Sequence, residues 1–260
     1  MDKNTYISAF NSIPVASEIE IKFTKDFISC SKRDLEVAEI LYMQDYYEHS
    51  IYFLQQSVEK IIKAYLIYMG NITKNELKEL NHKSPKAFLM HLDANWVNQV
   101  LDSTSKLFDS NLEQDKEFLK KKLKEPYENY AKLSKDFIIK FINEYKKISN
   151  AEKEIIKPEV VQEFEDFLVK TNNIDPLKLP KIDLNIIMAF SRGFKVLLPL
   201  SFVTFVHQAF TRYPDGMIKP SDYNKELGIV QSFLEIKEEV HFSINALEGI
   251  INYKPNSQNL

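Results

Sequence analysis

The chain has 260 residues, and 34 Lys+Arg against 37 Asp+Glu give it a formal net charge of −3 at pH 7. That length can bury one sizeable core, and the mild acidity argues against a broad electrostatic surface for nucleic acid. The 5 glycines are spaced so that a G-x-G-x-x-G dinucleotide fingerprint and a G-x-x-x-x-G-K phosphate loop are both excluded. The single cysteine, Cys30, excludes an internal disulfide and a cysteine-based zinc site.

No signal-peptide pattern is visible at the N-terminus, which predicts a cytoplasmic protein. The most apolar segment, 196–206, is about eleven residues long and contains Pro199. A bilayer span needs roughly 20 apolar residues, so this segment is interpreted as a buried helix, and no membrane association is expected.

Two helices are predicted at the start of the chain. Apolar residues recur at steps of three, four and seven over 24–44, and the next stripe begins at Ile51 and ends at Gly70. On the second helix, Glu59 and Lys63 have the favoured i,i+4 order for an ion pair. Only Asp45-Tyr46-Tyr47 separates the two helices, which favours an antiparallel helical hairpin.

The remainder of the chain also has helical periodicity. Helical spacing continues over 112–148, where Pro126 begins a new helix, and Pro158 opens another before a linker at 171–180. A third core helix is predicted over 184–210, bent near Pro199. A fourth begins near Ser221 or Asp222 as N-cap and ends before residue 255. No alternating run predicts a strand, so the fold class is all-α.

Three motifs, in this order, resemble the HEPN domain (higher eukaryotes and prokaryotes nucleotide-binding domain). The first is Asp34-Leu35-x-x-Ala38-x-x-Leu41, followed by Tyr47-x-x-Ser50 and by Gln55-Gln56-Ser57-Val58-Glu59-Lys60-Ile61-Ile62-Lys63-Ala64. The second is Asn81-His82-Lys83-Ser84-Pro85, and the third is Arg212-Tyr213-Pro214-Asp215, which follows a predicted helix. The resemblance covers about residues 24–92 and 184–253.

The resemblance implies an up-and-down four-helix bundle of HEPN type with additional inserted helices. On this interpretation, 1–95 holds an N-terminal segment and the first half of the bundle, 96–180 is a helical insertion, and 181–260 is the second half. The resemblance also implies a homodimer through helix faces, and a nucleotidyltransferase or antitoxin-like protein partner, with a nucleotide or RNA as ligand. No cofactor and no metal are expected.

Catalytic members of the family resemble ribonucleases that use Arg and, after four to six residues, His on the same helix. Such a pair suits RNA cleavage, because Arg binds phosphate bidentately and His exchanges protons near neutral pH. The chain has three arginines, Arg33, Arg192 and Arg212, and none is followed by His at that spacing. The ribonuclease motif is therefore absent, and we lean against an enzyme.

Several residues are nevertheless candidates for a site. The weak catalytic candidates are Arg212, with His207 or His241. His207 lies five residues before Arg212, but its apolar neighbours also fit a buried structural role. The candidates for ligand binding are Lys60, Lys63, His82, Arg212, Tyr213 and Asp215. Lys60 and Lys63 also fit a solvated helix face, and Arg212 also fits a cation at the negative end of a helix dipole.

These observations support three hypotheses of function. The leading one is an accessory HEPN module that binds a nucleotide, RNA or a protein, in a defence or toxin–antitoxin system. The first alternative is a metal-independent ribonuclease with a rearranged Arg/His site. The second is a structural module whose inserted helices bind a partner.

Overall fold

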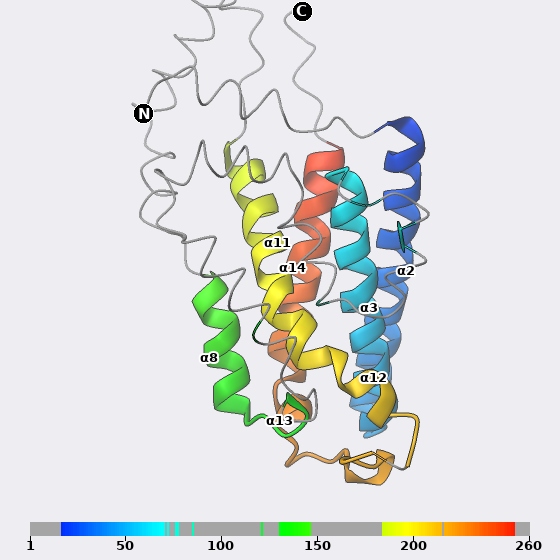
Figure 1. Ribbon diagram of the computed structural model, residues 1–260, viewed down its shortest axis with the longest axis vertical. Coiled ribbons are helices and arrows are strands. Elements are labelled where there is room, and N and C mark those ends of the chain that lie inside the picture. Colours follow the sequence, from blue (N-terminus) through cyan, green and yellow to red (C-terminus); the bar gives the residue numbers. More distant parts are fainter. Residues whose placement is uncertain are drawn as a thin grey trace, which may run out of the picture.

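The computed structural model describes residues 17–70, 72, 76–77, 85, 121, 130–146, 184–214 and 216–252. In these residues all regular structure is helical, with no strand, which confirms the predicted all-α fold. Figure 1 shows four long helices side by side: α2 (Glu18–Met43), α3 (Tyr47–Tyr68), α11 (Leu184–Phe205) and α14 (Phe233–Ile251). Successive members run in opposite directions, as an up-and-down bundle requires.

Helix α2 begins six residues before the predicted start. The Ser17 hydroxyl accepts a hydrogen bond from the Glu20 amide, and the Glu20 carboxylate accepts one from the Ser17 amide, which together form a capping box. Asp45 has a φ of 62° in the turn that follows the helix, a conformation that Asp tolerates better than most residues. The predicted tight turn and helical hairpin are therefore confirmed.

Small hydroxyl residues hold α2 and α3 close together. The Ser31 hydroxyl donates to the Ser57 carbonyl oxygen, and the Ser57 hydroxyl donates to the Ser31 carbonyl oxygen, each at 2.9 Å. Ser50 donates to the Ala38 carbonyl oxygen at 2.8 Å in the same way. All three serines are buried. Because each hydroxyl reaches a main-chain carbonyl of the facing helix, the two backbones must pack closely.

Helix α3 is the central helix of the core, and its predicted apolar stripe is confirmed. The helix ends before Gly70, whose φ of 67° is the left-handed conformation expected after a helix C-terminus. Tyr65 is fully buried and donates from its hydroxyl to the Ser243 carbonyl oxygen of α14 at 2.9 Å. The buried apolar residues of α3 that form this stripe are Ile51, Leu54, Val58, Ile61, Ile62, Ala64, Tyr65, Leu66 and Ile67.

The third predicted helix is divided into two. Helix α11 passes through Pro199 and ends at Phe205, Val206 interrupts it, and the short α12 (His207–Phe210) follows. The prediction of one helix over 184–210 is therefore wrong at its C-terminal end. Figure 1 shows the chain turning toward α3 between α11 and α12. This turn brings the Arg212-Tyr213 motif next to α3.

The predicted start of the fourth helix is also wrong. Residues Pro220–Asp222 form only a short 3-10 helix, η3, and another short helix, α13 (Gly228–Gln231), comes before α14. Ser232 is the N-cap residue of α14, and its hydroxyl donates to the Gly228 carbonyl oxygen at 2.8 Å. The connection 211–232 therefore forms a folded loop at one end of the bundle.

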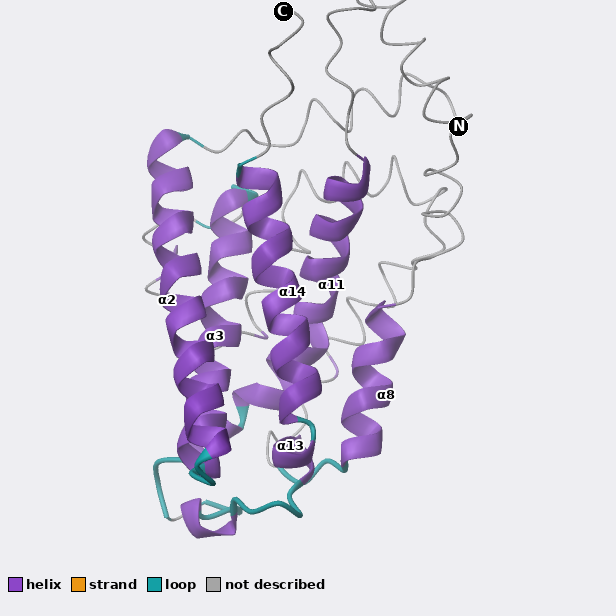
Figure 2. Ribbon diagram, turned by 180° about the vertical axis from the view of Figure 1, so that it is seen from behind, coloured by secondary structure: helices purple, strands orange, loops and turns teal. Residues whose placement is uncertain are grey.

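Helix α8 (Lys135–Lys146) lies outside the four-helix bundle, beside α11 (Figure 2). Its buried residues are Ile138 and Ile142. The Lys146 ammonium lies 2.6 Å from the Glu239 carboxylate of α14, and that carboxylate also lies 3.1 Å from the Arg192 guanidinium of α11. The prediction of a helix that begins at Pro126 is wrong over 131–134, which are not helical, because α8 begins only at Lys135. The predicted helix at Pro158 and the linker 171–180 lie outside the described residues, and the proposed domain division stays a prediction.

Candidate functional site

Arg212 lies in the turn that follows α12 and is exposed to solvent. Its Nε donates to the Gln208 carbonyl oxygen at 3.0 Å, which places a cation at the C-terminus of this short helix. The guanidinium carbon is 5.3 Å from the centre of the Tyr52 ring and 5.4 Å from the centre of the Tyr213 ring. Within the described part of the chain, its two terminal nitrogens have no hydrogen-bond or ion-pair partner. The guanidinium therefore presents its planar fork of donors beside two aromatic rings.

Tyr52 belongs to one face of α3, which we call the α3 outer face and define by His49, Tyr52, Gln56 and Lys63. Steps of three, four and seven residues place these side chains on one side of a helix. His49 is exposed, and its Nδ1 lies 2.9 Å from the Glu48 carboxylate. The sequence analysis did not identify Tyr52, because its partner Arg212 is distant along the chain and only the fold brings the two together.

Lys60 and Lys63 both have carboxylate partners. Lys60 pairs with Asp34 of α2, and Lys63 lies 2.6 Å from Glu59 on its own helix. The predicted i,i+4 ion pair is therefore confirmed. Glu59 is buried and also accepts a hydrogen bond from the Gln55 side chain at 3.2 Å. These contacts use the two lysines within the bundle, whereas no carboxylate among the described residues pairs with the exposed Arg212.

His207 is fully buried, although it lies only five residues before Arg212. Its Nδ1 and the Tyr223 hydroxyl are 2.7 Å apart, and its Nε2 has no hydrogen-bond partner. Burial lowers the pKa of His207 from 6.5 to about 3, and burial raises the pKa of Tyr223. His207 is therefore neutral at physiological pH and is bound in the interior, on a different side from the exposed guanidinium of Arg212.

The other candidates are more scattered. His241 is exposed on α14, and no described contact joins it to Arg212 or His207. Tyr213 is 55% exposed and contributes the second aromatic ring beside Arg212. His82 and Asp215 lie outside the described residues. The structure thus brings together Arg212, Tyr213 and Tyr52.

No group of three or more His, Cys, Asp or Glu side chains in the described segments could hold a metal ion. Among the same residues, no helix combines the length and the apolar character needed to span a bilayer.

Comparison with known proteins identifies the family. The family model described as the HEPN domain matches residues 24–157, which is more than half of the chain, so the protein belongs to the HEPN family. The match begins where the resemblance in the sequence begins, and it continues into the segment that we interpreted as an insertion.

One relative is a protein of Methanocaldococcus jannaschii named "Putative toxin MJ1304". It is 33% identical over 91 residues, which are 35% of this chain and 59% of the relative. The aligned region thus spans less than two thirds of that protein's length. No solved structure matches the chain.

Proposed function

We propose that this protein is a HEPN module of a toxin–antitoxin type system, and that it binds a phosphate-bearing nucleotide or RNA without cleaving it. The observation that carries this proposal is the exposed Arg212 fork, which lies beside two tyrosine rings and has no histidine in contact with it among the residues that the structure describes. Membership of the HEPN family and the name of the archaeal relative support the proposed setting.

The chemistry of Arg212 suits a phosphate. A planar guanidinium can donate two parallel hydrogen bonds to phosphate oxygens, and such charge-assisted bonds are stronger than neutral ones. The ring of Tyr52 supports the guanidinium from one side by a cation–π contact. Tyr213 offers an exposed ring on which a base can stack. Arg212, Tyr213 and Tyr52 together can therefore bind both parts of a nucleotide.

In the described part of the chain, no contact joins Arg212 to a histidine that could transfer a proton, and this includes His49 of the α3 outer face. Cleavage of RNA by its own 2′-hydroxyl needs a group that accepts a proton and one that donates a proton, both close to the phosphate. His207 is buried, hydrogen-bonded to Tyr223 and neutral. His241 lies on another helix without a described contact to Arg212. The proposed activity is therefore binding. The same proposal includes the protein partner implied by the resemblance, which is either antitoxin-like or a nucleotidyltransferase. It also includes a homodimer and a cytoplasmic location.

A binding experiment tests the role of Arg212. Fluorescence anisotropy with a labelled single-stranded RNA is measured for the wild type, Arg212→Gln and Arg33→Gln. Arg33 is without a described ion pair on α2, so its replacement changes the net charge equally. We expect Arg212→Gln to weaken binding about fivefold or more and to lower the slope of log K against log salt by about 0.7. Equal effects of the two variants would refute the proposal.

Two further measurements test the other parts. We expect the RNA to stay intact during incubation with the wild type. Cleavage that disappears in Arg212→Gln or in His207→Gln would instead establish the ribonuclease alternative. We also expect expression of the wild type to slow growth of a bacterial host, with relief by Arg212→Gln and no relief by Arg33→Gln. Unaffected growth with the wild type would remove the proposed toxin role.

A further inference from the structure

Exposed apolar side chains are concentrated at one end of the bundle. In the described part of the chain, every large exposed hydrophobic residue except Ile19 belongs to an element that meets this end. These elements are the last turn of α2, the α2–α3 turn, the first turns of α8 and α14, and the loop after α12, which lie together at the lower end in Figure 1. The residues are Ile40, Met43, Tyr46, Phe137, Tyr213, Met217 and Leu234. Such a concentration is typical of a surface that contacts another molecule.

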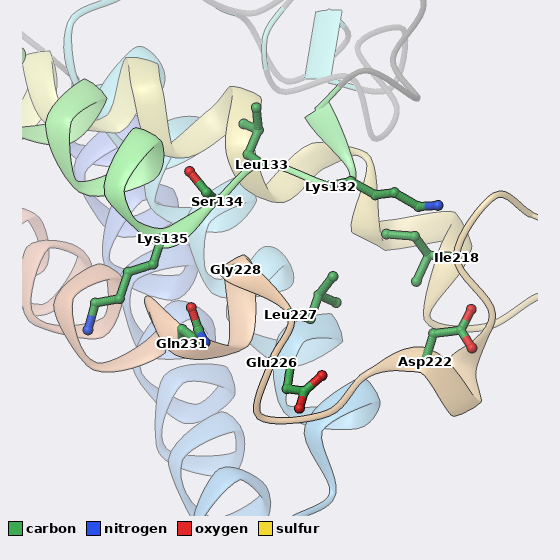
Figure 3. Close-up of a pocket in the computed structure, with 10 residues that line it drawn as sticks. All are labelled: Lys132, Leu133, Ser134, Lys135, Ile218, Asp222, Glu226, Leu227, Gly228 and Gln231. Atoms are coloured by element: carbon green, nitrogen blue, oxygen red, sulfur yellow. The ribbon is translucent and has the colours of Figure 1, made fainter.

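A cleft of about 410 Å³ opens at this end, on the side of α8 and α13. Its walls come from the segment before α8, from η3 and from the loop that leads into α13 (Figure 3). Ile218, Leu133 and Leu227 give it apolar walls. A second cavity of about 390 Å³ adjoins it, because Lys135 and Gln231 line both. We call the two neighbouring hollows together the groove.

Charges of opposite sign lie at different edges of the cleft. Figure 3 shows the Lys132 ammonium above Ile218, the Asp222 carboxylate below Ile218, and the Glu226 carboxylate below Leu227. No described ion pair uses any of these three groups, although the Asp222 carboxylate accepts a hydrogen bond from the Lys219 amide at 2.9 Å. By contrast, the other two lysines of the groove, Lys135 and Lys225, lie 2.7 Å from Glu235 and 3.2 Å from Asp45. The cation and the carboxylates without an ion pair are therefore separated by an apolar hollow and are accessible to a ligand.

We infer that this cleft is a docking site for a peptide segment of a second protein. The segment that fits has one bulky apolar side chain, with an acidic residue on the side of Lys132 and a basic residue on the side of Asp222 and Glu226. An apolar anchor in a hollow with a polar rim is the usual centre of a protein interface. A nucleic acid does not fit, because the cleft carries carboxylates beside its lysines and a polyanion needs a surplus of cations. This inference does not rest on the binding role proposed for Arg212.

The inference can be tested with a phage-displayed library of random peptides, selected on the immobilised wild-type protein after depletion on the Glu226→Lys variant. Selected peptides are then synthesised, and their affinities are measured by fluorescence anisotropy. We expect Glu226→Lys and Lys132→Glu each to weaken binding roughly three- to fivefold, the range for a partly exposed ion pair. Glu238→Lys and Lys140→Glu are matched controls, because both residues are exposed and neither lines the cleft, and the affinities of these variants should be unchanged.

A charge exchange gives the decisive result. A selected peptide whose basic residue is changed to Glu should bind the wild type more weakly and recover its affinity for Glu226→Lys. Four outcomes would overturn the inference. Two concern the peptides: no selected peptide depends on the cleft, or the charge exchange does not restore binding. Two indicate another occupant: a single-stranded RNA displaces the peptide, or sedimentation shows self-association that Glu226→Lys abolishes. The last outcome would make a second copy of the chain the occupant. Because RNA cleavage and growth are measured separately, failure here is distinguishable from failure of the proposed function.

Discussion

The buried imidazole of His207 should make the folded protein sensitive to mild acid, and replacing it by Gln should remove much of that sensitivity. The imidazole is fully buried, and burial lowers its pKa from 6.5 to about 3. In the unfolded chain the same group accepts a proton near its ordinary pKa. As pH falls below that value, the unfolded state binds one more proton than the folded state, and unfolding becomes more favourable.

The size of the effect follows from this difference. A folded-state pKa below the unfolded one means that the stabilisation is complete above about pH 6.5 and is lost as pH falls toward about 3. Each pH unit in that window changes the free energy of unfolding by about 1.4 kcal/mol. Between pH 7 and pH 5, the buried His207 should therefore lower the free energy of unfolding of the wild type by about 2 kcal/mol. This figure depends little on the folded-state pKa of His207 as long as that pKa stays near 3.

Urea unfolding of the wild type and of His207→Gln at these two pH values isolates the contribution of His207, because other titrating groups are common to both proteins. The wild type should lose about 2 kcal/mol more than the variant on acidification. The reasoning is wrong if the two proteins lose equal stability. In that case the imidazole would take up protons in the folded state, and a role in proton transfer beside Arg212 would again be open.

Two further predictions concern the elements that build the candidate surfaces. Gly228→Ala would place a methyl group 1.9 Å from the Leu133 carbonyl oxygen, so it should destabilise the fold by about 1–3 kcal/mol through overpacking. Gly249→Ala, which meets nothing within 4 Å, should be neutral or stabilising. Thermal unfolding compares the two variants, and equal shifts in Tm would contradict the close packing of α13 against Leu133. Glu239→Gln removes the buried carboxylate shared by two cations and should lower the free energy of unfolding by about 2 kcal/mol. Glu248→Gln, at a more exposed ion pair, should lower it by under about 1 kcal/mol. Urea unfolding measures both variants, and equal losses of stability would show that α8 is not held by the Glu239 cluster.

The parts of the fold that depend on local periodicity could be predicted from the sequence. The apolar stripes of α2 and α3 predict two amphipathic helices. Because the turn between them is too short for any other arrangement, the sequence also predicts an antiparallel helical hairpin. The start of α14 could not be predicted in the same way. Ser221 and Ser232 are equally good N-cap residues in sequence, and the choice between them depends on tertiary packing, since Gly228 lies against the backbone of Leu133.

The candidate site was only partly predictable, for a related reason. Arg212 and Tyr213 were found because they form a motif, but Tyr52 is one aromatic residue among several on α3. Its contact with Arg212 arises only because the chain turns at Val206 and brings α12 to α3. The groove beside α13 could not be predicted either, because its charged edges come from segments far apart in sequence.

The placement of His207 and Arg212 also shows why spacing alone was a poor guide to chemistry. Helix α12 ends at Phe210, so Arg212 lies in the turn beyond it and is exposed, whereas His207, the first residue of α12, is fully buried. The structure shows this division: His207 bonds to Tyr223 in the interior, and Arg212 lies against Tyr52 at the surface. A histidine and an arginine at this spacing can share a phosphate only if neither belongs to the core. Because His207 is in the core and Arg212 is exposed, Arg212→Gln tests the proposed phosphate binding more directly than a substitution of His207.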